Sequence, residues 1–340
     1  MCGRVGLPRV SRAVATVVAA AVACAGLAAC SGSTPPSPTG ASTTASPGTS
    51  TGTSTASASG PSAAPAKTSG ASGAGPTPAA GALRSYRTSV VHHGADHPDD
   101  LALDLSGALL YSDYTSGTVT RLSGDGSTTV VHRGLDGPEG LVQLANGTLV
   151  VAEENTNRVL AFAPGRQAPK VLATLPGRPV KATCRGGVDG IAWDAETLTL
   201  VVPDPVTGTI YRLTPQGGSL TPLARGFVHP VGAVVDARGA VYVADECGGD
   251  VWRLGSGGSR TRVARASMPD DLAFDAAGDL LVTDVRHVVH DVRRWPADGG
   301  TPTVLARSGL VEPQGLLVTP TGDVYVSDDE ADVILRLSPR

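Results

Sequence analysis

Residues 81–340 lack the motifs that identify the common enzyme classes. They contain no G-x-S-x-G nucleophile elbow, no Walker phosphate loop, no H-E-x-x-H zinc motif and no C-x-x-C-H haem motif. They also lack a sustained 3.6-residue apolar period, so we expect few helices. Positive charge is scarce as well. The chain has a net charge of −4, and its first 80 residues hold bases but no acid, so the remainder is more acidic still. An acidic domain is a poor candidate for binding nucleic acid.

The first 30 residues have the layout of an export signal. Arg4, Arg9 and Arg12 precede an apolar run over 13–29, which is short for a membrane span and ends in small residues. The run closes with Leu-Ala-Ala before Cys30, which resembles the lipobox of bacterial lipoproteins, whose cysteine is lipidated. The resemblance implies a signal peptide over 1–29 and a lipid on Cys30 that anchors an exported protein to the outer face of the bacterial cell membrane. An ordinary secretory signal is the alternative. Cys24 is a weaker lipidation candidate, because Ala21 stands where the lipobox prefers leucine.

Residues 30–80 are almost entirely Ser, Thr, Ala, Gly and Pro after the cysteine, with Lys67 as the one charged side chain. Such a composition cannot bury a core and predicts a disordered linker. As a flexible coil it would span about 40 Å. That length would hold the domain 81–340 clear of the membrane.

A short run recurs along the domain 81–340. HPDDLALDLSGALLYSD at 97–113 matches MPDDLAFDAAGDLLVTD at 268–284, and weaker copies lie between and after them. A glycine turn, a β-rich run and two further apolar runs, such as TVTRL and STTVVHRG, complete each copy. Four short strands in a repeat of about 43 residues are typical of a propeller blade. The copies begin at Pro98, Pro138, Val188, Pro230, Pro269 and Pro313, which we call the anchors.

The two ends of the domain complement each other. The last copy stops after its third run, VILRL, whereas residues 86–91 resemble a fourth run. The sequence therefore predicts an all-β, six-bladed β-propeller with four antiparallel strands per blade, whose last blade is closed by the N-terminal strand. This closure leaves no open sheet edge between the chain ends.

The repeats also resemble known families over residues 86–340. PEGLVQLANGTLVVAEENTNRVLAF and HPVGAVVDARGAVYVADECGGDVWRL are similar to NHL repeats. MPDDLAFDAAGDLLVTD resembles a blade of the gluconolactonase and senescence-marker-protein family. Both families are six-bladed propellers, so the resemblance implies the fold. It leaves the function open, because propellers include lactonases, lyases, synthases and binding modules.

The residue after each anchor is expected to point into one mouth of the central channel. Carboxylates that share one axis repel unless water, protons or a cation neutralise them. Oxygen ligands in a wide ring suit Ca²⁺ or another divalent metal better than Zn²⁺. A solvated acidic channel without a metal is the alternative. The six positions are Asp99, Glu139, Asp189, Val231, Asp270 and Gln314.

The gluconolactonase-like resemblance gives some of these positions a role. In that family acidic or amide residues at the starts of inner strands bind the metal. The resemblance places Asp270 at the family's PDG aspartate, Asp189 at an amide position and Asp99 at a glutamate position. It implies that Asp270 is a metal ligand and the catalytic base. The family's PNG asparagine falls on Val231, which cannot bind a metal, and Glu139 could compensate from its own blade.

Three further groups of polar side chains are candidates for structural or functional roles. The acids at the end of the second run are expected to accept hydrogen bonds from turn amides; they are Asp113, Glu153, Asp204, Asp245, Asp284 and Asp328. Asp100 and Asp271 replace a repeat glycine and are expected to point away from the channel acids. Four histidines near the mouth could add a ligand or carry a proton; they are His97, His229, His287 and His290.

Cys184 and Cys247 are the only cysteines after residue 30. In an exported protein such a pair is expected to form a disulfide, here between loops of adjacent blades on the mouth face. The bond would hold the insertion 177–187, whose Arg178, Lys181 and Arg185 are basic in an acidic domain. The insertion could gate the channel or recognise an anion, and a plain solvated loop is the alternative.

Three functions from different classes remain. The first is a lipid-anchored propeller outside the cytoplasm, expected to be a monomer, that binds a small molecule, a cell-envelope ligand or a protein at the channel mouth. The second is a metal-dependent hydrolase of the lactonase type, in which a Ca²⁺-like ion polarises the substrate carbonyl. The third is a lyase that uses the mouth histidines.

Overall fold

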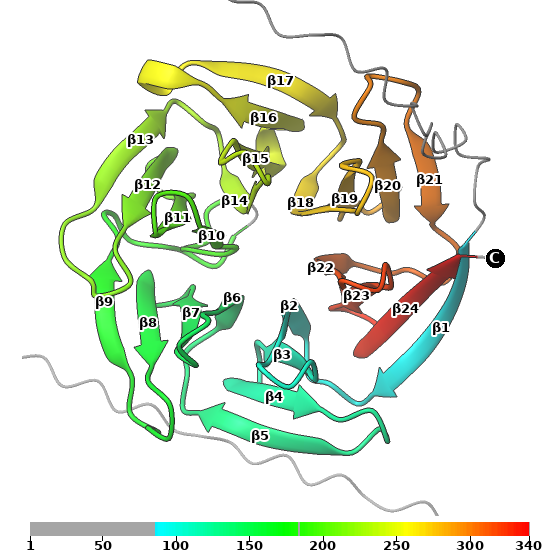
Figure 1. Cartoon of the computed structure of the whole chain (residues 1–340), viewed down its shortest axis with the longest axis horizontal. Coiled ribbons are helices and arrows are strands. Elements are labelled where there is room, and N and C mark those ends of the chain that lie inside the picture. The colour runs from blue at the N-terminus through cyan, green and yellow to red at the C-terminus, as the bar shows by residue number, and fades with distance from the viewer. Residues whose placement is uncertain (1–85, 183, 340) are drawn as a thin grey trace, which may run out of the picture. The chain divides into compact units, whose positions relative to one another are not determined.

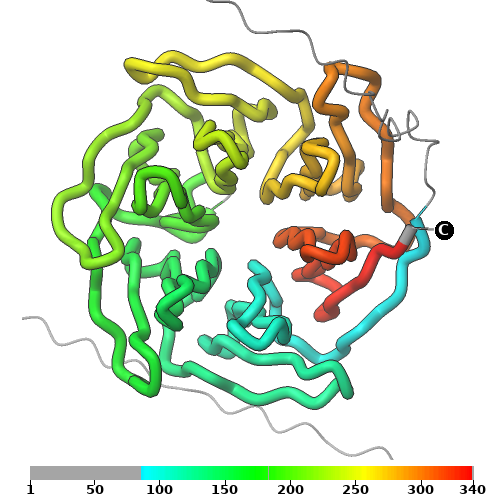
Figure 2. The backbone as a smooth tube through the Cα atoms, in the orientation of Figure 1, coloured from blue at the N-terminus to red at the C-terminus, as the bar shows by residue number. Residues whose placement is uncertain are grey.

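The computed structural model describes residues 86–182 and 184–339. They form six four-stranded antiparallel sheets arranged in a ring (Figures 1 and 2), so the predicted six-bladed propeller is confirmed. The expected signal peptide 1–29, the lipidation site Cys30 and the linker 30–80 lie outside the described residues. In the described part no helix is long and apolar enough to cross a membrane. The helices there are two single 3-10 turns, η1 (Glu246–Gly248) and η2 (Ser256–Gly258).

Blades 1 to 5 follow the chain outward from the innermost strand. Blade 1 contains β2 (Pro98–Leu103), β3 (Leu109–Asp113), β4 (Thr118–Leu122) and β5 (Thr128–Arg133). Blade 2 contains β6 (Pro138–Gln143), β7 (Leu149–Glu153), β8 (Arg158–Phe162) and β9 (Lys170–Thr174). Blade 3 contains β10 (Ala192–Asp194), β11 (Thr199–Asp204), β12 (Thr209–Leu213) and β13 (Thr221–Arg225). Blade 4 contains β14 (Pro230–Val235), β15 (Val241–Asp245), β16 (Asp250–Leu254) and β17 (Arg260–Arg265). Blade 5 contains β18 (Pro269–Phe274), β19 (Leu280–Asp284), β20 (Asp291–Trp295) and β21 (Thr303–Ala306).

Blade 6 joins the two ends of the described chain. Its strands are β22 (Pro313–Val318), β23 (Val324–Asp328), β24 (Val333–Pro339) and β1 (Tyr86–His93). The pairing of β1 with β24 runs from Tyr86 opposite Pro339 to His93 opposite Val333. The predicted closure by the N-terminal strand is confirmed, and Figure 1 shows β1 outside β24 at the rim of the ring.

Hydrophobic packing occurs at every seam between neighbouring blades. Each of six clusters of buried residues combines side chains from two adjacent blades, including the seam between blades 6 and 1. A blade therefore buries both of its faces. This explains why β3, β7 and β19 are buried along their whole length rather than at alternate residues.

The turns between the first and second strands explain the repeat glycine. In blade 1, Asp104 Oδ1 accepts hydrogen bonds from the amides of Ser106 and Ala108, and Gly107 has a φ of +82°. Only glycine adopts that left-handed conformation without a steric cost. Blade 3 lacks the glycine, and there Leu198 takes a φ of +54°. These turns define the hairpin face of the ring, opposite the mouth face that carries the anchors.

Candidate functional site

The channel acids lie where each innermost strand leaves its sheet. In blade 1, Pro98 pairs with Asp113, and the next pair is Leu101 with Tyr111, so the strand bulges between them. Blades 2, 4, 5 and 6 have the same irregularity after their anchors. A bulge turns side chains out of the ladder and is common beside functional sites. The side chain of the residue after the anchor can therefore point toward the centre of the ring.

Three of the four predicted metal ligands line one cavity at the centre. The cavity has a volume of about 10 Å³, and its walls include Asp99, Asp189 and Asp270. This is the volume that one water-sized particle needs. Glu139 is not part of the wall, but it is 7% exposed and its Oε2 has no hydrogen-bond partner among the described residues. The remaining wall is formed by Asp100, Asp271, Gly190, Gly232 and Gly315.

Val231 departs from the expected ring. It is 1% exposed and packs with Ala244, Val251 and Leu272 in the cluster between blades 4 and 5. An apolar side chain gains more from that seam than from a channel lined by carboxylates. Gln314 is half-buried and does not line the cavity either. The acids of blades 1, 3 and 5 therefore form the centre of the site.

The pKa values of the channel acids are raised by their surroundings. Burial is the largest cause for Asp99, and the charge of Asp189 adds to it. Burial and the charges of Asp189 and Asp99 raise the pKa of Asp270 well above its usual range. The pKa values of Asp189 and Glu139 are likewise raised, by burial first and neighbouring carboxylates second. Among the described residues, no ion pair includes any of these four acids. None of the four carboxylates is therefore paired with a cationic side chain in the described part of the chain.

Asp100 and Asp271 form part of the same wall, contrary to the expectation that they belong elsewhere. Each carboxylate bridges two blades. Asp100 accepts from the amides of Leu101 and, in blade 2, Leu141. Asp271 accepts from the amides of Leu272 and, in blade 6, Leu316. Burial raises the pKa of Asp100 to about 7 despite these bonds.

The glycines at the same repeat position explain why the substitution is possible in only some blades. A Cβ atom on Gly140, Gly232 or Gly315 would come within 2.4 Å of a carbonyl oxygen of the next blade. A side chain at these positions would collide with that backbone. Asp100 and Asp271 occupy seams where the next blade instead presents an amide to their carboxylates. The second acid of each PDD run therefore joins blades and also adds negative charge to the cavity.

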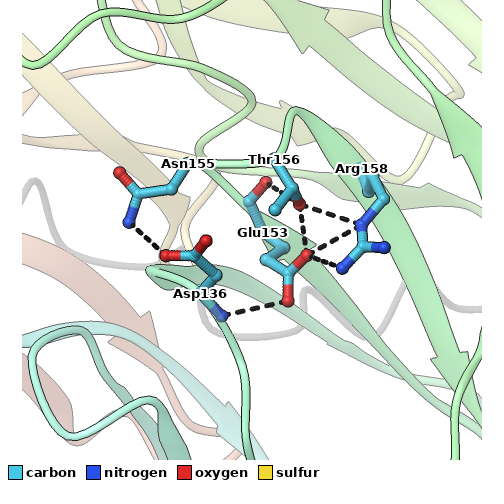
Figure 3. Close-up of polar contacts among 5 residues, drawn as sticks. All are labelled: Asp136, Glu153, Asn155, Thr156 and Arg158. Carbon is cyan, nitrogen blue, oxygen red and sulfur yellow. Dashed lines mark hydrogen bonds and ion pairs between the residues drawn. The ribbon is translucent and has the colours of Figure 1, made fainter. Parts of the chain in front are cut away.

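Five of the six acids at the ends of the second strands accept hydrogen bonds from loop amides, as predicted, and these amides belong to the loops that precede the anchors. Asp204 instead accepts from the hydroxyl of Thr207. Asp245 accepts from the amides of Val228 and His229, and Asp284 accepts from those of Ser267 and Met268. In blade 2 the longer Glu153 does the same for Asp136 (Figure 3). Its other oxygen accepts from Thr156 and Arg158. These carboxylates are structural.

Asp328→Asn should destabilise the domain. Asp328 accepts from the amides of Val311 (2.9 Å) and Glu312 (2.8 Å) through separate oxygens. An amide retains one acceptor and turns an NH₂ group toward the other amide, which should lower the free energy of unfolding by about 1–3 kcal/mol. Urea denaturation measures this change. Glu330→Gln, an exposed neighbour, is the matched control, and equal midpoints for the two variants would contradict the structural role.

A second layer of polar groups surrounds the mouth; its histidines were predicted, and their carboxylate and tyrosine neighbours were not. His97 Nδ1 lies 3.0 Å from Asp329 Oδ2, and His229 Nδ1 lies 2.8 Å from Glu246 Oε2. The hydroxyl of Tyr114 donates to Glu154 Oε2 at 2.7 Å. These side chains directly precede an anchor or directly follow a second strand, and that position is the signal that could have found them. His287 and His290 lie together on a blade 5 loop, with ring centroids 5.5 Å apart.

The mouth layer brings possible metal ligands closer together than the channel acids do. In the described ranges, ligand atoms of three side chains converge within 4.8 Å at Glu312, Asp329 and Glu330, and at His229, Glu246 and Cys247. Cys247 is bonded to Cys184, with Cα atoms 5.9 Å apart, so its sulfur is not a free thiolate. Burial and the charge of Asp329 raise the pKa of Glu312 to about 7.

The insertion 177–187 lies against this mouth layer. The Gly187 amide donates to Glu154 Oε1 at 3.2 Å, and the Val188 amide donates to Asn157 Oδ1 at 2.9 Å. Lys181 Nζ lies 5.5 Å from the centroid of the Tyr114 ring. The disulfide ties the end of the insertion to blade 4. The basic insertion therefore contacts the acidic mouth at blades 1, 2 and 4.

Comparisons with known proteins agree on the architecture. No protein-family model matches the chain, and no curated protein matches it. A solved gluconolactonase-like protein has a TM-score of 0.61 and 16% identity, covering 75% of this chain and 92% of that one. A streptogramin B lyase has a TM-score of 0.58 and 13% identity, covering 75% of this chain and 98% of that one. A chain of the nidogen/laminin complex has a TM-score of 0.57 and 19% identity, covering 67% of this chain and 88% of that one. At these identities the likeness shows one thing, that the chain is a propeller of the kind shared by gluconolactonase-like, lyase and NHL or nidogen propellers.

Proposed function

We propose that this propeller is a binding module whose channel mouth takes a cation, and that a divalent ion of the Ca²⁺ type is the simplest such ligand. The observation that carries the proposal is the central cavity, where Asp99, Asp189 and Asp270 meet and make no ion pair with any described side chain. A bound cation would remove the repulsion that raises their pKa values. Glu139 Oε2 is also buried without a hydrogen-bond partner among the described residues. A buried carboxylate oxygen normally has a partner, and a bound cation would provide one.

The donor set fits a hard divalent ion in kind, and the cavity has room for one such ion. All the charged groups are oxygen ligands, which Ca²⁺ prefers, and the cavity holds one particle of about the size of a water molecule. Asp99, Asp189 and Asp270 would hold the ion, and Glu139 could approach from blade 2. When bound, the ion would supply positive charge at the mouth. The side chains of this protein would orient a ligand around it, with the layer of Glu154, Glu246 and Asp329 outside.

Calcium should raise the melting temperature of the full chain after treatment with a chelator. An ion that binds only the folded state stabilises it by mass action, by about 2.7 kcal/mol at a hundredfold excess over its dissociation constant. Differential scanning fluorimetry measures the shift. Asp270→Ala should abolish it, whereas Asp236→Asn, in a turn on the hairpin face, should retain it. A melting temperature that does not respond to Ca²⁺, Mg²⁺ or Mn²⁺ would refute the proposal.

Hydrolysis of a lactone is the alternative for the same site. It would require the ion to polarise a carbonyl, with Asp270 as ligand and base. The burial of Val231 in the seam removes one ligand that the gluconolactonase-like resemblance implies. A lactone panel tests this alternative once calcium binding is established. Activity that Asp270→Ala abolishes would favour the hydrolase over the binding module.

One observation favours a lyase as a further candidate. His229 is 5% exposed, its Nδ1 faces Glu246, and its buried Nε2 has no hydrogen-bond partner within residues 86–182 and 184–339. A carboxylate-oriented imidazole with a free nitrogen is a suitable general base. Proton abstraction by His229 would survive removal of metal and would be lost in His229→Ala, which separates it from the hydrolase.

We further propose that the site operates outside the cytoplasm, on a lipid anchor at Cys30. The ligand would then be a small molecule, a cell-envelope component or a protein partner. Cys30→Ser should release the protein from the membrane fraction of an expressing bacterium. Release of a processed protein from wild-type cells would instead indicate an ordinary secretory signal.

A further inference from the structure

A second cavity in the described part of the chain lies away from the channel. It has a volume of about 350 Å³ and opens between blades 1 and 2. Its rim includes Asp104, Gly147 and Arg166, which belong to turns on the hairpin face. The cavity is thus separate from the acidic mouth on the opposite face. Its volume is within the range of small-molecule sites.

One position of the repeat has a different residue at this seam. His132 lies opposite Val119 in the sheet. At the corresponding position blades 2 to 5 have alanine; these residues are Ala173, Ala224, Ala264 and Ala306. Blade 6 has His92, whose Nε2 lies 3.2 Å from the hydroxyl of Tyr111. His132 has no such partner, because blade 2 has Val151 where blade 1 has Tyr111.

His132 instead stacks on an aromatic ring in the cavity wall. Its ring lies 3.8 Å from that of Phe162, with an interplanar angle of 23°. The Nδ1 atom of His132 is buried and has no hydrogen-bond partner in the part of the chain that the structure describes. Burial also lowers the pKa of His132. The half-buried imidazole itself offers the flat surface, since Phe162, Leu110 and Leu149 are only 2%, 3% and 4% exposed and form the buried base of the cavity.

The charged groups at this cavity are mainly positive, unlike those of the domain as a whole. Arg121 is paired with Asp104 at 2.6 Å and is also bound to Ser123. Arg166 is exposed and makes no ion pair or side-chain hydrogen bond with the described residues. Its guanidinium is therefore free to bind an anion, and carboxylates are its preferred partners.

We propose that the cleft between blades 1 and 2 binds a small planar aromatic carboxylate. The aromatic ring of the ligand packs against the imidazole of His132, which is itself stacked on the buried Phe162, and the carboxylate binds Arg166 at the rim. Gln143 and Gln167 also line the cavity and supply polar groups beside the anion. This site is independent of the channel acids, which would repel the same ligand.

The test uses 2-naphthoate as the probe and the full chain, with fluorescence titration or calorimetry as the measurement. We expect one saturable site per chain. Arg166→Glu should weaken binding about tenfold, which corresponds to the loss of about 1.4 kcal/mol. His132→Ala should weaken it as well, and this variant should fold because alanine occupies the position in four other blades. Arg238→Glu, an exposed arginine in a turn of blade 4, is the matched control and should bind like the wild type.

A neutral analogue separates the contribution of the carboxylate from that of the aromatic ring, and a channel variant tests that the two sites are independent. The neutral 2-naphthol should bind the wild type more weakly than 2-naphthoate does. Its affinity should be the same for Arg166→Glu as for the wild type. Asp270→Asn should leave naphthoate binding unchanged, because the channel is on the other face. No saturable binding, or binding that Arg166→Glu and His132→Ala both leave unchanged, would overturn the proposal.

Discussion

Asp270→Asn is expected to raise the melting temperature of the metal-free protein at pH 7 and to leave it unchanged at pH 4. The variant removes one of the carboxylates that meet in the central cavity and keeps the shape of the side chain. No side-chain hydrogen bond of Asp270 is lost, since it makes none with the described residues. In a domain of this size each kcal/mol corresponds to about 2–4 °C, and thermal unfolding in a chelator at both pH values measures the gain.

The expected rise in melting temperature at pH 7 follows from the raised pKa values of the channel acids. A carboxyl whose folded-state pKa exceeds its unfolded value binds its proton more tightly in the native state. Its favourable contribution is complete below the unfolded pKa, about 4 for aspartate, and is lost as the pH rises through the folded value. For Asp100 that window ends at about 7, and the pKa values of Asp99, Asp189 and Asp270 are also raised. The wild type should therefore lose stability between about pH 4 and neutrality, and calcium should restore it. An Asp270→Asn variant less stable than the wild type at pH 7 would show that the carboxylate is already neutralised.

Removal of β1 is expected to have the largest effect on the fold. A chain that starts at residue 94 would leave blade 6 with three strands and β24 as an open edge. Unpaired edges of this kind promote aggregation. The partner strand β24 also carries Ile334 and Leu337, both 0% exposed, which pack at the two seams of blade 6.

The matched control for this deletion is a chain that starts at residue 86. We expect it to keep a cooperative thermal transition, because the described fold begins with Tyr86. The shorter chain should aggregate or lose that transition altogether. Equal melting temperatures and monomeric elution for both chains would mean that β1 does not hold the ring closed.

The sequence was sufficient to predict the ring of six blades but not the contacts between neighbouring blades. Anchor spacing and the fourth-strand pattern at residues 86–91 predict all six blades, because a repeat reports its own strands. They also predict the loop-holding role of acids such as Asp328, since that contact lies within one blade. The Asp100 bond to Leu141 crosses to the next blade, and its register cannot be read from a single repeat.

The site was predicted in part for the same reason. Asp99, Asp189 and Asp270 share one repeat position, so a common axis brings them together. The orientation of Val231 was wrong, because an apolar residue at that position rotates into the seam rather than the channel. The mouth layer, such as His229 with Glu246, depends on how two loops return to the same face. Comparison of the repeats would have found His132, which stands where four blades have alanine.

Equilibrium dialysis of the chelator-treated full chain against calcium tests the central claim most directly. We predict about one bound ion per chain at pH 7, in a cavity of single-ion size. The ion should be lost in Asp270→Ala and in Asp189→Ala, which remove the ligand oxygens, and retained in Asp236→Asn. A chain that binds no calcium, or whose Asp189→Ala and Asp270→Ala variants bind it as well as the wild type, would contradict the account.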